Sequence, residues 1–227
     1  MILYPLLFLG AYALVYNYIF QVDNPAIGRG LNFVLFIFCG LVPFLGFAEA
    51  VTSGVSAVTG NANLIKNTLF PIELLPIKSV LVAQGSQLIG LAMLLVALGI
   101  AGRLTPWALV LPLVWLCQLL LTIGIVWVLA SSAVILRDLQ HAVSVLMLVV
   151  MMLSPIAYTT EMVPPALVPL LTLNPLYPII IACQDVLFMG HFPRGATLYV
   201  LPVLSVFVFC AGYWYFCRLK QVFAENV

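Results

Sequence analysis

The stretch LNFVLFIFCGLVPFLGFAEAVTSGVSAV, residues 31–58, contains a single charged side chain, Glu49. A helix of about 20 mostly apolar residues crosses the ~30 Å hydrocarbon core of a bilayer at ~1.5 Å per residue. The stretch therefore predicts a membrane-spanning helix. The whole chain shares its character, since 65% of the 227 residues are hydrophobic and 7% are charged. A soluble domain carries about 25% charged residues, so the sequence predicts an all-α integral membrane protein.

Six segments are long and apolar enough, or nearly so, to span a membrane. They are approximately residues 2–20, 31–58, 77–101, 106–136, 142–158 and 196–217. The fourth is longer than a span requires, which predicts tilt or extension beyond the hydrocarbon. The first lacks the basic start and the cleavage site of a signal peptide, so we expect a retained helix. Residues 1–227 are thus expected to form a single transmembrane domain.

Prolines divide the apolar region 159–195 into pieces too short to span. They are Pro164, Pro165, Pro169, Pro175 and Pro178. Backbone without internal hydrogen bonds is prohibitive where lipid surrounds it, so the pieces must be interfacial or buried in protein. We expect a short helix–loop–helix, a re-entrant pair that dips back from the membrane face before the last span.

Basic residues between the spans predict the orientation, because they are enriched on the cytoplasmic side. With the N-terminus inside, the cytoplasmic segments hold Lys66, Lys78, Arg137, Arg218 and Lys220. The outer segments hold Arg29, Arg103 and Arg194. Both termini are therefore expected in the cytoplasm and the proline-rich region outside.

No familiar catalytic motif occurs in the chain. The patterns GxxxxGK[ST], HExxH and GxSxG are absent, no CxxC occurs, and His141 and His191 are isolated. A net charge of +1 argues against a nucleic-acid partner. Glu49 has two interpretations: a functional acid within a span, or a carboxylate near the helix end that touches headgroups or a neighbouring helix. We expect neither a metal site nor an enzyme.

The stretch NANLIKNTLFPIELLP, residues 61–76, interrupts the apolar pattern with Lys66 and Glu73. Asn61 or Asn63 can cap the start of a short helix, and Pro71 disfavours further helix at Phe70. Apolar residues about a turn apart would anchor this helix on a partner, and they are Leu64, Ile65, Leu69 and Phe70. The residues alone fit a docking helix and an interfacial helix on headgroups equally well.

Aromatic residues recur along the first two predicted spans. At 100° per residue, Phe33, Phe36, Phe44 and Phe47 fall within a wedge of about 80°. With Tyr12 and Tyr16 of the first span, these rings are candidates for lining a path on which sugar rings slide. They also suit a lipid-facing surface, an interfacial belt or packing between helices.

Three stretches, in this order and spacing, resemble one family. They are NANLIKNTLFPIELLP after a span containing GLVPFLGF, then LRDLQHAVSVLMLVVMMLSPIAY, then LNPLYPIIIACQDVLF. From about residue 20 to residue 217, the chain resembles the membrane (permease) subunit of type-2 ABC exporters, particularly those that export O-antigen, capsule or teichoic acid polysaccharides.

The resemblance implies a transporter subunit of the bacterial inner membrane that moves a lipid-linked, O-antigen-like polysaccharide. It implies a separate ABC ATPase, which binds the ATP and magnesium, so that this chain itself needs no cofactor. One six-helix chain is too small to enclose a pore wide enough for a glycan, so we expect a homodimer with two copies of the ATPase. Residues 61–70 would form a coupling helix on the ATPase, and Arg137, Asp138, Leu139, Gln140 and His141 a second contact. Alternatives are export of teichoic acid, capsule, a small lipid or a drug, and a carrier without an ATPase.

The chain departs from the family pattern at two places. Relatives carry a basic amphipathic helix before the first span, whereas this sequence starts almost inside that span, so we expect a truncated or misplaced start. Relatives also often have arginine where this chain has Gln184, directly before Asp185.

Overall fold

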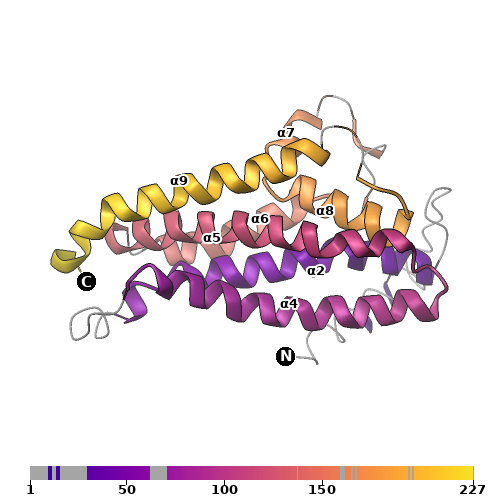
Figure 1. The fold of residues 1–227 in the computed structure, drawn as a ribbon, viewed down its shortest axis with the longest axis horizontal. Coiled ribbons are helices and arrows are strands. Elements are labelled where there is room, and N and C mark those ends of the chain that lie inside the picture. The colour runs from indigo at the N-terminus through magenta and orange to yellow at the C-terminus, as the bar shows by residue number, and fades with distance from the viewer. Residues whose placement is uncertain are drawn as a thin grey trace. The chain divides into compact units, whose positions relative to one another are not determined.

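The computed structural model describes residues 10–11, 14–15, 30–61, 71–136, 138–158, 162–164, 166, 168–193, 195 and 197–226. All regular structure in this part of the chain is helical (Figure 1), and it contains no β-strand. The prediction of an all-α protein is confirmed.

Four helices are long and apolar enough to cross a membrane among the described residues. They are α2 (Leu31–Gly54), α4 (Leu74–Ile100), the 3-10 turn η3 (Pro106–Val110) continued by α5 (Leu111–Ile135), and α9 (Thr197–Asn226). The first predicted span lies almost wholly outside the described residues. Shorter elements are η2 (Thr59–Asn61), α6 (Leu139–Leu153), α7 (Val168–Thr172), α8 (Tyr177–Gln184) and the π-helical turn η5 (Asp185–Met189).

The α2 helix is the most enclosed of the four, with 78% of its most apolar stretch buried inside the chain. It is apolar around its whole circumference, as expected for a helix that packs on all sides. Glu49 lies one turn before its end at Gly54 and is exposed, which agrees with a carboxylate near a helix terminus.

The α4 and α9 helices expose apolar faces instead. Val82 and Ile100 of α4 are 54% and 85% exposed, and Phe207 of α9 is 68% exposed. Contiguous apolar surface of this kind is rare on soluble proteins. Apolar side chains can stay exposed without a free-energy cost where lipid hydrocarbon, rather than water, surrounds the helix.

The α6 helix has 15 residues, which span about 22 Å at 1.5 Å per residue. It begins at Leu139, three residues before the predicted start, and ends at Leu153 ahead of Pro155. Proline lacks the N–H that would continue the helix.

The chain divides into two compact units. Unit 1 comprises residues 1–45, 86–114 and 152–198, and unit 2 comprises residues 46–85, 115–151 and 199–227. Within unit 1, the proline-rich region forms the short helices α7 and α8, with Pro178 in the first turn of α8, a position where proline costs no hydrogen bond. The turn η5 ends at Met189 and is followed by Gly190, whose left-handed conformation (φ 70°) suits glycine.

Within unit 2, α5 and α9 approach each other at two glycines. A Cβ atom added to Gly212 would lie 2.2 Å from the carbonyl oxygen of Gly124, and one added to Gly124 would lie 2.4 Å from the carbonyl oxygen of Val208. Small residues let helix backbones pack closely in membranes, where the hydrophobic effect does not drive helices together.

Candidate functional site

The predicted coupling segment lies between two described parts of unit 2. Residues 62–70 and Arg137 are outside the described residues, so Asn63, Leu64, Ile65, Lys66, Leu69 and Phe70 have no described position. Both flanks of the segment are described, and each makes specific contacts.

The flank before the segment is the turn η2. The Gln140 Nε2 atom donates a hydrogen bond of 3.0 Å to the Thr59 hydroxyl oxygen. Asn61 donates through Nδ2 to the Ala57 carbonyl oxygen at 2.8 Å. The side-chain amide of Asn61 therefore closes the preceding turn. Gln140, within the second predicted ATPase contact, is hydrogen-bonded to the same turn.

The flank after the segment is held through Glu73. Its carboxylate accepts a short hydrogen bond from the Lys220 Nζ atom of α9, within an ion pair. Its backbone carbonyl accepts a hydrogen bond of 3.1 Å from the Trp127 indole N–H of α5. The Trp127 ring packs at 5.1 Å and 5.2 Å, between centroids, from Phe209 and Tyr213. This flank is thus tied to two helices at once.

The electrostatics of this contact favour the ionised carboxylate. Partial burial by itself raises the pKa of Glu73, but the hydrogen bond from Lys220, a backbone hydrogen bond and the Lys220 charge together outweigh it. The pKa of Glu73 is consequently lowered from its ordinary value. A nearby opposite charge, or a hydrogen bond to the charged form, favours the ionised form of a carboxyl group.

Sequence reasoning missed the roles of Trp127 and of the Glu73–Lys220 pair. It used Lys220 only as a marker of orientation and Glu73 only as an interruption of the apolar pattern. The sequence places Glu73 and Lys220 on the same, cytoplasmic face of the membrane, and this was the signal that could have indicated the ion pair. No residue spacing indicates that the Trp127 indole reaches the Glu73 carbonyl.

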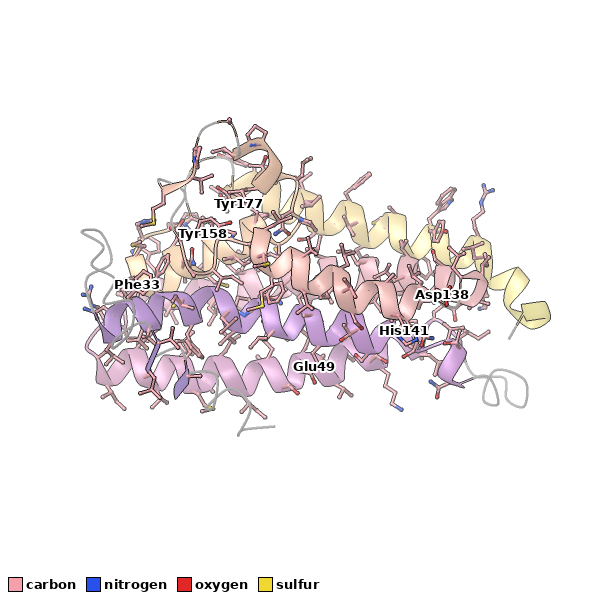
Figure 2. The ribbon with its side chains drawn as sticks, turned by 180° about the vertical axis from the view of Figure 1, so that it is seen from behind. Phe33, Glu49, Asp138, His141, Tyr158 and Tyr177 are labelled. Carbon is pink, nitrogen blue, oxygen red and sulfur yellow. The ribbon has the colours of Figure 1, made fainter. Side chains whose placement is uncertain are left out.

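Asp138 and His141 lie at the start of α6 and are exposed (Figure 2). The Asp138 carbonyl oxygen accepts the backbone N–H groups of His141 at 3.2 Å and Ala142 at 3.1 Å, which closes the first turn. Both side chains are accessible to a partner. Their role as ATPase contacts stays a prediction.

The four phenylalanines proposed to line a channel are buried. Phe33, Phe36, Phe44 and Phe47 are between 1% and 3% exposed in a single copy of the chain, and the Phe36 ring meets the Phe188 ring edge-on at 5.7 Å. Tyr12 and Tyr16 lie outside the described residues. Burial of the four rings within one copy favours packing between helices, and their lining of a channel stays a prediction.

Buried polar groups join the short helices of unit 1 to the chain after α6. The Gln184 Nε2 atom donates to the Pro155 carbonyl oxygen at 2.9 Å, and Asn174 donates to the Ser154 hydroxyl at 2.9 Å. Asn174 also accepts the backbone N–H of Leu176 through Oδ1. Gln184 therefore satisfies a buried carbonyl two residues beyond the end of α6, a need that the sequence did not reveal.

These features define a multi-helix integral membrane protein, whose described residues hold no group of histidine, cysteine and acidic side chains able to bind a metal ion. No protein-family model matches the chain. It is 30% identical over 227 residues to the O-antigen export system permease protein RfbA of Myxococcus xanthus, covering 98% of this chain and 85% of that protein. A protein of the same name from Klebsiella pneumoniae is 28% identical over 224 residues, covering 97% of this chain and 83% of its own.

The chain belongs to the family of O-antigen export system permeases. The resemblance inferred from three stretches of sequence is confirmed, and so is the assignment of the chain as a permease subunit.

Proposed function

We propose that the chain is the channel-forming membrane subunit of an ATP-driven exporter that moves a lipid-linked, O-antigen-like polysaccharide across the bacterial inner membrane. The similarity to O-antigen export permeases over 97–98% of the chain carries the proposal. Similarity over 97–98% of the chain includes residues of both compact units, which supports the proposal that residues 1–227 act as one transmembrane domain.

The proposed architecture has six spans, cytoplasmic termini and an outer re-entrant pair formed by α7 and α8. The four long helices account for four spans, and the short α6 and the first predicted segment supply the other two. Two copies of the chain assemble with two copies of a separate ABC ATPase, which binds ATP and magnesium. One copy is too small to enclose a path wide enough for a glycan, so the path lies between copies.

Residues 61–70 are the proposed coupling helix, and residues 137–141 the second ATPase contact. The contacts of both flanks support this role. Gln140 links the two proposed contacts through Thr59, and Glu73 links the end of the coupling segment to α5 and α9. Movement of the segment would therefore reach three helices through direct hydrogen bonds.

A double substitution tests the function. Leu69→Glu with Phe70→Glu removes the apolar anchors, so export of polysaccharide to the cell surface should stop while the protein still inserts in the membrane. Leu69→Met with Phe70→Leu keeps apolar anchors and serves as the matched control. Surface polysaccharide, detected with a specific antiserum, and membrane content, detected by immunoblot, give the result. Normal export by the glutamate variant would contradict the coupling role.

A further inference from the structure

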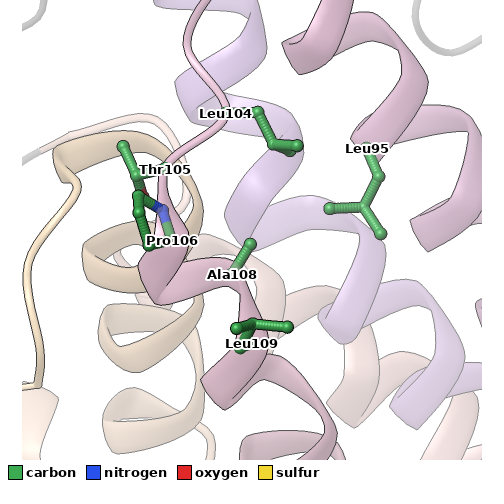
Figure 3. Close-up of a pocket in the computed structure, with 6 residues that line it drawn as sticks. All are labelled: Leu95, Leu104, Thr105, Pro106, Ala108 and Leu109. Atoms are coloured by element: carbon green, nitrogen blue, oxygen red, sulfur yellow. The ribbon is translucent and has the colours of Figure 1, made fainter.

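The turn between α4 and α5 lies at a membrane face, because it connects two consecutive candidate spans, Leu74–Ile100 and Pro106–Ile135. A cavity of about 490 Å³ opens beside it (Figure 3). Its lining is formed by Leu95, Leu104, Thr105, Pro106, Ala108 and Leu109. All but Thr105 are apolar.

The surroundings of this cavity, here called the turn groove, suit a hydrocarbon chain. Leu104 and Leu109 are 53% and 85% exposed, so the groove is open to the surroundings of the protein. The Thr105 hydroxyl donates to the Val186 carbonyl oxygen at 3.4 Å and is thereby engaged within the protein. An apolar groove open to the membrane accepts an acyl chain at no desolvation cost to a polar group.

A cation lies beside the turn groove. Arg103 directly precedes Leu104, and its guanidinium carbon lies 5.4 Å from the centroid of the Phe188 ring. Phe188 is itself buried against Phe36, so packing holds in place the ring that the guanidinium contacts. Within the described part of the chain, Arg103 has no carboxylate partner. Its side chain is exposed, which leaves its N–H donors available to an anion.

Two packed aromatic side chains, Trp107 and Phe192, lie close to the turn that carries Arg103. The Trp107 ring packs 5.6 Å from the Phe192 ring, between centroids, and is 43% exposed. Tryptophan is enriched at the membrane–water interface, at the level of the lipid headgroups. Because Trp107 follows Arg103 by four residues at the start of a candidate span, we expect the cation and the mouth of the groove to lie at the headgroup level.

We propose that the turn groove binds one anionic phospholipid, with its phosphate on Arg103 and an acyl chain in the groove. Arginine recognises phosphate through paired N–H donors. A net negative headgroup is preferred because Arg103 lacks an acidic partner in the described structure, whereas a zwitterionic headgroup brings its own ammonium to the phosphate. The site is distinct from the proposed coupling segment and independent of the exported substrate.

Purified protein in detergent provides the test, with phosphatidylglycerol as the anionic probe and phosphatidylcholine as the zwitterionic one. Native mass spectrometry should show phosphatidylglycerol retained preferentially by the unchanged chain. Arg103→Gln should weaken that binding by about fivefold, the contribution of one basic residue near an anionic membrane surface. Arg103→Lys should keep most of the preference, because it keeps the charge.

Arg218→Gln is the matched control, since the Arg218 guanidinium also lies over a ring, 4.9 Å from the centroid of Trp214. It should leave the lipid preference unchanged. Ala108→Trp fills the turn groove without removing the cation, and it should reduce retention of both lipids. Equal retention of the two lipids by the unchanged chain would overturn the proposal. So would unchanged binding in Arg103→Gln or in Ala108→Trp, or an equal loss in Arg218→Gln.

Discussion

At the scale of single residues, Gly124 and Gly212 set how closely α5 and α9 pack. The atoms that an added Cβ would meet are backbone atoms of the facing helix, 2.2–2.8 Å away. Backbone cannot move aside as a flexible side chain does, so the two helices would have to separate.

We expect Gly212→Ala to destabilise unit 2 by about 1–3 kcal/mol, the usual cost of overpacking. Gly85→Ala on α4 is the control, because nothing lies within 4 Å of the added methyl group. It should be neutral or stabilising by up to about 1 kcal/mol, since alanine favours helix more than glycine does. Thermal unfolding in detergent measures both variants, and a Gly212→Ala protein as stable as Gly85→Ala would refute the close contact.

The buried phenylalanines give a second residue-scale prediction. Phe36→Ala and Phe44→Ala should each cost about 3–5 kcal/mol, because truncating a packed ring leaves a cavity. Phe207→Ala on the exposed face of α9 is the control and should change stability little. Stable single variants of Phe33, Phe36, Phe44 and Phe47, together with a quadruple variant that assembles but does not export, would instead support the channel interpretation.

At the scale of helices and turns, the sequence was a good guide wherever hydrophobicity decides the structure. The long apolar runs became α2, α4, α5 and α9, because backbone in lipid must satisfy its own hydrogen bonds. The aromatic wedge of α2 does not by itself decide between channel lining and packing between helices. A helix buried on nearly all sides places every ring in a packed environment, so periodicity does not single out a functional face.

Contacts between distant segments were beyond sequence reasoning for a different reason. The Gln184–Pro155 and Trp127–Glu73 hydrogen bonds join residues 29 and 54 positions apart. A buried carbonyl needs a donor, but which donor reaches it depends on how helices pack. The sequence shows Pro155 as a helix breaker, and it does not show that Gln184 satisfies the Pro155 carbonyl beyond the end of α6.

The Glu73–Lys220 pair is expected to make stability depend on pH. Because the pKa of Glu73 is lowered in the folded chain, the pair contributes above the ordinary glutamate pKa of about 4.3 and is lost as the pH falls through the folded value. At about pH 7 the free energy of unfolding of the unchanged chain should therefore exceed that of Glu73→Gln, by at most about 1 kcal/mol for a partly exposed pair. The unchanged chain should also have the higher melting temperature.

That difference in melting temperature should shrink on acidification below the ordinary glutamate pKa. Lys220→Met should behave like Glu73→Gln at neutral pH, and the double variant should be little worse than either single variant. A difference that stays constant with pH would show that the carboxylate charge is irrelevant to this contact.

At the scale of the whole molecule, the chain is a permease that depends on a separate motor subunit. Purified alone, it should show no ATP hydrolysis, because its sequence has no phosphate-binding loop. After mixing with the cognate ATPase, it should elute as a complex whose mass fits two copies of each subunit. Steady hydrolysis by the single polypeptide would refute the division of labour, and light scattering on the mixture measures the stoichiometry.

The two flanks of residues 62–70 are each fixed by side chains from outside that segment, namely Gln140 on one side and Trp127 with Lys220 on the other. The two ends of the segment are therefore held independently of the sequence between them. If these residues form the proposed coupling helix, replacing them with the equivalent stretch of a relative should change the contact with the ATPase and leave the flanking hydrogen bonds intact. Under the proposed coupling role, exchange of residues 62–70 alone is therefore a route by which two exporters in the same cell can diverge in their choice of ATPase while keeping the rest of the permease.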